Sequence, residues 1–149
     1  MAVATGDLHD AVGVRLGDDD QRYTAGRREL VELLAAAHRP LTVAEVLERA
    51  DGLTQSSVYR NLSLLERAGV VHRVVTEDEF ARFELAEDLT GHHHHHLVCS
   101  SCGTVDDFTL DASLEEALDD ALASAASTVG FEVRQHRLDL VGTCRRCRR

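Results

Sequence analysis

A chain of 149 residues can hold one ordinary domain or two small ones, and its 44% of hydrophobic residues suffices for a buried core, which excludes wholesale disorder. No apolar run approaches the roughly 18 residues of a membrane span, and the start lacks a secretory-signal pattern, so we expect a cytoplasmic protein with no membrane partner. The net charge of −10 argues against nucleic acid as a partner of the chain as a whole.

The charge is nevertheless distributed unevenly. Residues 21–75 carry eight arginines and six acidic residues, whereas the rest of the chain carries eight arginines and twenty acidic residues. A slightly basic segment beside a strongly acidic one fits a DNA-binding module joined to a module that binds cations, although acidic surfaces are common in proteins.

The first half of the chain predicts helices followed by a hairpin. Residues 1–20 show no sustained hydrophobic period and predict a loose arm or a frayed helix. Helical spacing of apolar residues then predicts three short helices, at residues 24–37, 42–50 and 55–68. Two further runs, joined by a polar turn at residues 76–79, predict a two-stranded hairpin at residues 70–75 and 80–85. This order outlines a winged helix-turn-helix, a DNA-binding fold.

The second half is smaller and follows a linker at residues 86–91. Its predicted elements are two strands on either side of a Cys-x-x-Cys turn, an amphipathic helix and a last strand, at residues 93–98, 104–108, 114–129 and 131–141. The helix places Leu114, Leu118 and Leu122 on one face. So small a unit is expected to depend on a metal or a partner subunit for its stability.

The third predicted helix has a polar face that suits DNA. Recognition helices present the polar residues of their N-terminal part to base edges and phosphates in the major groove. The residues in question are Gln55, Ser56, Ser57, Tyr59 and Arg60. The alternative is an ordinary amphipathic helix with a solvated polar face, and the winged-helix order of the elements favours DNA.

The four cysteines form two Cys-x-x-Cys pairs, Cys99 with Cys102 and Cys144 with Cys147. Each pair can chelate one metal through a tight turn, and two pairs complete a tetrahedral site of four sulfurs, so the spacing favours structural zinc. A redox dithiol and four bystander thiols are the alternatives. Neither explains the duplicated spacing as well.

The run His92–His96 precedes the first cysteine pair directly. If it is extended, its side chains alternate, with His94 and His96 on one face and His93 and His95 on the other. Nearby candidates for a mixed ligand set are carboxylates and one further histidine: Glu84, Asp106, Asp107, Glu115 and His136. Such sets bind Zn, Fe(II), Mn or Ni without choosing among them. A flexible polar loop is the alternative, which we favour for His92 alone.

Four stretches together resemble the ferric uptake regulator family: SSVYRNLSLLERAGVV, RFEL, HHHHHLVCSSCGTVDDF and HRLDLVGTCRRC. The resemblance covers about residues 22–147. It implies a dimeric, metal-responsive transcriptional repressor of α+β class. The implied architecture is an N-terminal winged helix-turn-helix followed by a small α/β dimerisation domain.

The resemblance also implies roles for individual residues. Structural zinc would be bound by Cys99, Cys102, Cys144 and Cys147. The regulatory metal near the hinge would be bound by Glu84, His94, His96 and Asp107. A second metal site would consist of His93, His95, Glu115 and His136. Tyr59 and Arg60 match the DNA-contacting pair of the third helix, and Arg27 matches a basic residue of the first.

Three positions depart from the family pattern. Iron and peroxide sensors have a histidine where this chain has Pro40, and His38 lies two residues away. Zinc sensors take a ligand from the position of His72, which could equally be an exposed strand residue. Zinc sensors also tend to have cysteine, and peroxide sensors aspartate, at the position of Glu84. These positions point to zinc or Fe(II) as the regulatory metal and leave membership of the zinc-sensing branch as one option; Mn and Ni are further options for the metal.

We therefore expect a metal-dependent repressor of metal-homeostasis genes that binds palindromic double-stranded DNA as a homodimer and is not an enzyme. The expected division is a winged-helix domain, a hinge and a metal-binding dimerisation domain, at residues 1–86, 87–92 and 93–149. The alternative functions are a metalloenzyme or metal-storage protein that uses the histidine and carboxylate groups, and a zinc-stabilised dimerisation module.

Overall fold

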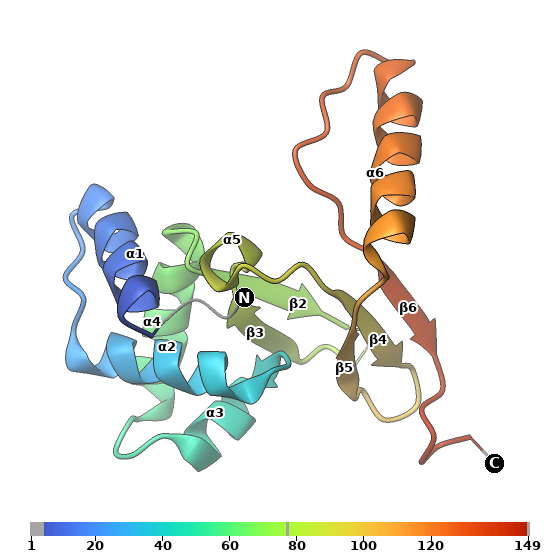
Figure 1. Ribbon diagram of the computed structural model, residues 1–149. Coiled ribbons are helices and arrows are strands. Elements are labelled where there is room, and N and C mark those ends of the chain that lie inside the picture. Colours follow the sequence, from blue (N-terminus) through green and yellow to red (C-terminus); the bar gives the residue numbers. More distant parts are fainter. Residues whose placement is uncertain (1–4, 77, 149) are drawn as a thin grey trace.

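The computed structural model describes residues 5–76 and 78–148, which form two three-stranded sheets and the helices around them (Figure 1). The helices are α1 (Thr5–Asp18), α2 (Ala25–Ala37), α3 (Val43–Arg49), α4 (Gln55–Arg67), α5 (Glu87–Thr90) and α6 (Ala112–Ser127). The strands are β1 (Leu41–Thr42), β2 (Val71–Val75), β3 (Ala81–Leu85), β4 (His95–Cys99), β5 (Val105–Phe108) and β6 (Asp139–Gly142).

The first sheet has the strand order β1-β3-β2, and with α2, α3 and α4 it forms the winged helix-turn-helix expected from the sequence. Local signals set its helix ends. Thr42 and Glu45 form a capping box at the start of α3, and Gly69, with φ of 69°, follows Ala68, the C-cap residue of α4. The antiparallel register of β2 and β3 runs from Val71 opposite Leu85 to Val75 opposite Ala81. This register places His72 opposite Glu84.

The N-terminal arm corrects the sequence prediction, because residues 5–18 form the regular helix α1 rather than a loose arm. Residues 1–4 lie outside the described residues. Leu8, Val12 and Leu16 recur once per turn and are buried against the helical core. A stripe of one apolar residue per turn is too narrow to stand out in a pattern search, yet it is enough to dock a helix on an existing core.

The second sheet has the order β5-β4-β6, with β5 antiparallel and β6 parallel to the central β4. The last strand is shorter than predicted, because β6 comprises only Asp139–Gly142 and His136 precedes it. The neighbouring strand β4 begins at His95, and the first pair between β4 and β6 is His96 opposite Asp139. Residues 131–138 therefore have no strand to pair with among the described residues. The expected linker contains the short helix α5, anchored by the buried Leu89.

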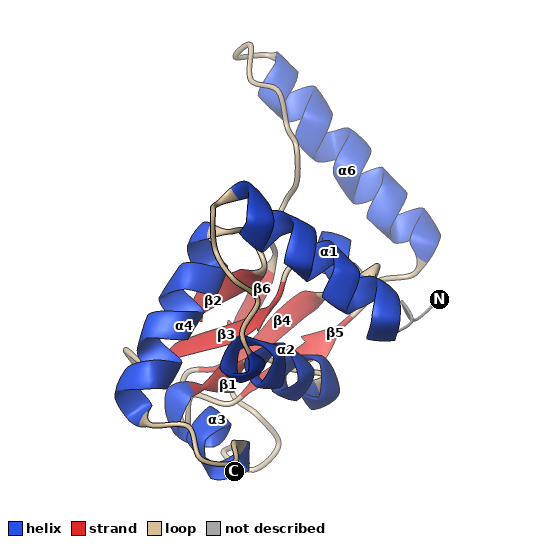
Figure 2. Ribbon diagram, turned by 90° about the vertical axis from the view of Figure 1, so that its left-hand side faces the viewer, coloured by secondary structure: helices blue, strands red, loops and turns tan. Residues whose placement is uncertain are grey.

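The hydrophobic core lies almost entirely in the first ninety residues. No residue of α6 is buried against the described part of the chain, and Leu114 and Leu122 of its apolar face are 55% and 37% exposed. Figures 1 and 2 show this helix projecting away from the other elements. The second half therefore has little core of its own, as its length suggested.

Among the described residues, no helix combines the length and the apolarity needed to cross a membrane.

The packing of α1 gives a stability prediction. Replacing the fully buried Leu16 by alanine should lower the free energy of unfolding by about 2–5 kcal/mol, because it leaves a cavity under the helix. The matched control is Val14→Ala in the same helix, where the side chain is 65% exposed and the change should cost little. Urea unfolding midpoints measure both. Equal midpoints for the two variants would show that α1 is not docked in solution.

Candidate metal centres

Strand β4 and the two residues before it distribute their side chains to three clusters of possible metal ligands. Within each cluster, one ligand atom per residue lies within 4.8 Å of all the others. The clusters are Glu84 with His94, His96 and Asp107; His93 with His95, Glu115 and His136; and Cys99 with Cys102, Cys144 and Cys147. As the alternation predicted, His94 and His96 belong to the first cluster and His93 and His95 to the second, whereas His92 belongs to none. Regular strand structure nevertheless begins only at His95.

The first cluster, which we call the hinge cluster, joins the two sheets. Glu84 lies on β3 of the first sheet, and its Oε2 atom is 3.0 Å from Nε2 of His94 and 3.1 Å from Nε2 of His96. Both histidines belong to the segment that forms the second sheet. The hairpin of β2 and β3 points toward β4 and β5 (Figure 1). One carboxylate oxygen is therefore hydrogen-bonded to two imidazoles from the other half of the molecule.

The hydrogen bonds of the hinge cluster favour a charged Glu84 carboxylate and charged imidazoles. Burial disfavours the Glu84 carboxylate, but hydrogen bonds with His94 and His96 outweigh it and lower the pKa of Glu84 to about 2. The hydrogen bond to Glu84 raises the pKa of His94 to about 9 against the effect of burial. Without a metal, imidazolium groups thus hold the position that a cation would take.

Asp107 completes the hinge cluster from β5. Burial raises its pKa, and its Oδ1 atom is buried without a hydrogen-bond partner among the described residues. Its Oδ2 atom lies 3.9 Å from Nε2 of His94. A buried carboxylate oxygen without a partner is costly, and coordination to a cation would satisfy it.

The two uncertain histidines line two different pockets, both of which reach the hinge cluster. His72 lines a cavity of about 20 Å³ together with Glu84, His94 and His96, which is room for one water-sized occupant. His38, in a left-handed conformation at the end of α2, lines a separate cleft of about 390 Å³ that also reaches Glu84 and His94. Neither is among the four residues whose ligand atoms lie within 4.8 Å of one another.

The second cluster, which we call the helix cluster, joins the histidine run to α6. The Oε1 atom of Glu115 lies 3.1 Å from Nε2 of both His93 and His136, and Oε2 lies 3.1 Å from Nε2 of His95. Oε2 and His95 form a hydrogen bond, whereas the buried Oε1 atom has no contact with hydrogen-bond geometry among the described residues. Ligands of a tetrahedral zinc ion at about 2.0 Å would be separated by similar distances, so the residues present fit a metal.

Outer carboxylates orient several of these imidazoles and were not found from the sequence. Nδ1 of His96 is 3.0 Å from Asp139, Nδ1 of His136 is 2.9 Å from Asp119, and Nδ1 of His93 is 2.7 Å from Glu87. Such partners fix which ring nitrogen faces a metal. Asp119 lies four residues after Glu115 on the same helix, a spacing that could have revealed it. Glu87 and Asp139 have no comparable signal.

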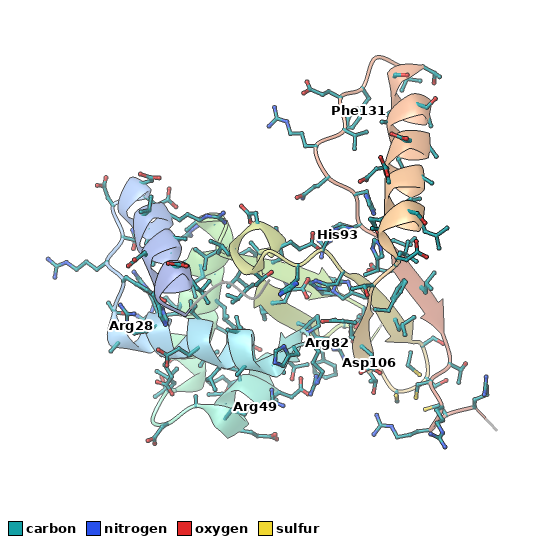
Figure 3. The ribbon with its side chains drawn as sticks, viewed as in Figure 1. Arg28, Arg49, Arg82, His93, Asp106 and Phe131 are labelled. Atoms are coloured by element: carbon teal, nitrogen blue, oxygen red, sulfur yellow. The ribbon has the colours of Figure 1, made fainter. Side chains whose placement is uncertain are left out.

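The third cluster contains the four cysteines, which are free thiols beside the end of β6 (Figure 3). The sulfurs of Cys102 and Cys144 are 3.8 Å apart, close to the separation expected for two thiolates at about 2.3 Å from one zinc ion. The Cys144 backbone N–H donates to the Cys99 sulfur at 3.2 Å, and this bond lowers the pKa of Cys99 to about 6. Gly103 closes the turn with φ of 70° and packs against Asp78 of the hairpin, where a side chain would clash.

The predicted DNA-reading residues lie away from the clusters. Gln55, Ser56, Tyr59 and Arg60 are exposed along α4, and Tyr59 is 50% exposed. Arg27 differs, because its Nε donates to Asn61 of α4 at 3.2 Å and its guanidinium also bonds the backbone of Arg22. Arg27 therefore braces α2 against α4 in addition to any contact with DNA.

Comparisons with known proteins agree with this architecture. The sequence profile described as the ferric uptake regulator family matches residues 18–141. The ferric uptake regulation protein of Bacillus subtilis is 30% identical over 143 residues, which cover 93% of each chain. The peroxide-responsive repressor PerR of Staphylococcus epidermidis is 26% identical over 85% of this chain and 81% of its own. The crystal structure of the Vibrio cholerae ferric uptake regulator superposes with a TM-score of 0.70 at 28% identity, covering 89% of this chain and 98% of that one.

The cysteine cluster gives a first prediction for this region. Cys144→Ser should abolish binding of about one zinc ion per chain and unfold the second half, since the zinc supplies folding free energy that its small core lacks. Ser101→Ala, in the turn between Cys99 and Cys102, is the control. Metal analysis and circular dichroism report the result, and a Cys144→Ser protein that keeps its zinc would disprove the assignment.

The hinge cluster predicts a pH dependence in protein whose hinge metal has been removed but whose cysteines retain zinc. The raised pKa of His94 adds stability that is complete below 6.5 and lost as the pH rises to about 9. The lowered pKa of Glu84 adds stability that is complete above 4.5 and lost as the pH falls toward about 2. The melting temperature should therefore decline between pH 6.5 and 9.

Calorimetric scans across this range test the effect. Glu84→Gln removes the partner of both imidazoles and should flatten the decline. An equal decline in Glu84→Gln would place its origin outside the hinge cluster.

Proposed function

Because this chain belongs to the ferric uptake regulator family, we propose that it represses metal-homeostasis genes with zinc or Fe(II) as its co-repressor, bound at the hinge cluster. Members of this family are metal-dependent DNA-binding transcriptional repressors. The observation that supports the hinge cluster as the regulatory site is the shared Glu84 oxygen, which faces His94 and His96 across the two sheets.

The proposed mechanism follows from that bridge. Glu84, His94, His96 and Asp107 would together hold a metal in place of the protons that they share in its absence. Binding by all four residues thereby fixes the winged helix relative to the second sheet, and so fixes the angle at which α4 approaches DNA. The metal acts as an effector because it binds one arrangement of the two halves more tightly than others. Its positive charge also reduces the repulsion between an acidic protein and DNA.

The donor set narrows the choice of metal without fixing it. Two imidazoles and two carboxylates suit zinc, Fe(II), manganese and nickel. Entry of His72 would add a third imidazole, and its position in the small cavity beside the cluster supports this addition. We infer a zinc or Fe(II) co-repressor, with structural zinc at the four cysteines and a further metal at the helix cluster.

Regulators of this family bind DNA as dimers, and the exposed apolar face of α6 offers a surface for a second copy. A two-fold dimer suits a palindromic operator, which we propose as the target. In the same proposal, residues 1–86 bind DNA, residues 87–92 form the hinge, and residues 93–149 bind metal and dimerise. Exposed Tyr59 and Arg60 of α4, together with Gln55, Ser56 and Ser57, would read the DNA.

Membership of a family of transcription regulators favours this function over a metalloenzyme or a metal-storage protein.

The test is a gel shift with a palindromic promoter fragment at buffered free Zn²⁺ or Fe²⁺. Metal should strengthen DNA binding of the unaltered protein by roughly 5–150-fold, the usual range of allosteric coupling. His94→Ala should abolish this gain, since it removes one imidazole from Glu84.

His92→Ala is the matched control, because His92 is exposed and belongs to none of the three clusters. His92→Ala should keep the full metal response. A full response in His94→Ala as well would remove the hinge cluster from the mechanism.

A further inference from the structure

We propose that Glu87 is a positioning residue that couples the hinge cluster to the helix cluster, so that metal binding at either one strengthens binding at the other. Glu87 is the first residue of α5, between the two sheets. The inference rests on the proposed function only in taking both clusters as metal sites.

Each oxygen of the Glu87 carboxylate has a different task. Oε2 lies 2.7 Å from Nδ1 of His93, and Nε2 of the same ring lies 3.1 Å from Glu115. Glu87 therefore accepts a hydrogen bond from the Nδ1–H group of His93 and leaves Nε2 free to face the helix cluster. A carboxylate in this position fixes the tautomer and orientation of a ligating imidazole and increases its basicity.

The other oxygen acts on the next residue of the chain. Oε1 accepts a hydrogen bond from the backbone N–H of His94 at 3.3 Å and lies 3.8 Å from Nδ1 of the His94 ring. The opposite end of that ring, Nε2, faces Glu84 in the hinge cluster. The same carboxylate thus holds two consecutive histidines whose rings point to different clusters.

The position of Glu87 is itself fixed by its helix. Leu89 is buried in the core, and Asp88 forms an ion pair with Arg15 of α1, which also donates to the backbone carbonyl of Gly69 at the end of α4. Figure 3 shows His93 between this short helix and the base of α6. The carboxylate is therefore presented from an anchored element, which a freely rotating surface side chain would not be.

Coupling follows from sharing one carboxylate. A metal on Nε2 of His93 makes the Nδ1 proton more acidic and strengthens its hydrogen bond to Glu87. A Glu87 held in this way keeps the His94 backbone in place, so less ordering remains for a metal at the hinge cluster. The same free energy must appear when the hinge cluster fills first, because binding linkage is reciprocal.

The experiment is a double-mutant cycle on the full-length dimer with zinc retained at its cysteines. Chelator competition gives the Zn²⁺ affinity of the hinge cluster in the unaltered protein, Glu87→Gln, His136→Ala and the double variant. His136→Ala disables the helix cluster and should weaken Zn²⁺ binding at the hinge cluster by about fivefold or more. In the Glu87→Gln background the same substitution should have no further effect.

A second readout reports on the helix cluster itself. Glu87→Gln should lower its Zn²⁺ affinity by about 10–100-fold, the usual effect of losing an outer carboxylate, and should change the visible absorption of Co²⁺ bound there. Glu116→Gln is the control, since it makes the same charge change at an exposed position of α6 that belongs to none of the three clusters. Circular dichroism and retention of the cysteine-bound zinc show that each variant is folded.

The cycle decides between coupling and a merely structural role. Equal effects of His136→Ala in the two backgrounds would overturn the proposal, as would a Glu116→Gln protein that loses coupling to the same degree. These outcomes are separate from the proposed repressor function, which fails only if His94→Ala keeps the metal response of DNA binding.

Discussion

The molecule depends on one constraint, which is that the buried Glu84 carboxylate must be neutralised by groups from the other sheet. A buried carboxylate is stable only when it is paired with cations or coordinated to a metal. In the metal-free state the partners are the imidazoles of His94 and His96, whose pKa values rise for that reason. A divalent metal can take the place of their protons while it keeps the same residues together. The same pairing therefore holds the two halves near one another, and in the proposed mechanism it would make their arrangement sensitive to metal.

The chain from Gly91 to Cys102 serves three clusters because alternate residues of an extended segment face opposite ways. His94 and His96 turn toward the hairpin, His93 and His95 toward α6, and the cysteines follow in the turn. Few apolar side chains are buried in this half, so its stability depends on ion pairs and metal ligands more than on a hydrophobic core. The Cys-x-x-Cys turn also touches the hairpin, through the contact of Gly103 with Asp78. Metal chemistry and the placement of the winged helix are thus joined at two points of the interface.

The sequence was sufficient for features that depend on local pattern. Helical spacing and turn residues predicted α2, α3, α4 and the hairpin. Cysteine spacing predicted one four-sulfur cluster, and alternation predicted the division of the histidine run, whereas the full ligand sets came from the family resemblance. The sequence was insufficient where tertiary contacts decide. Helix α1 has one apolar residue per turn and docks only because a core exists to receive it. The last strand is short because β4 begins late, and Glu87, six residues before His93, meets that imidazole only through the turn of α5. Asp139 reaches His96 from 43 residues further along the chain. Long-range partners of this kind leave no periodic signal in a single chain.

The central claim is that metal at the hinge cluster fixes the winged helix relative to the second sheet. Its most direct test is the distribution of distances between spin labels, attached through unnatural amino acids, at exposed Arg49 of α3 and Asp120 of α6 in one protomer. With zinc already at the cysteines, added Zn²⁺ should convert a broad distribution into a narrow one, and His94→Ala should keep the broad distribution. An identical distribution with and without metal in the unaltered protein would contradict the account.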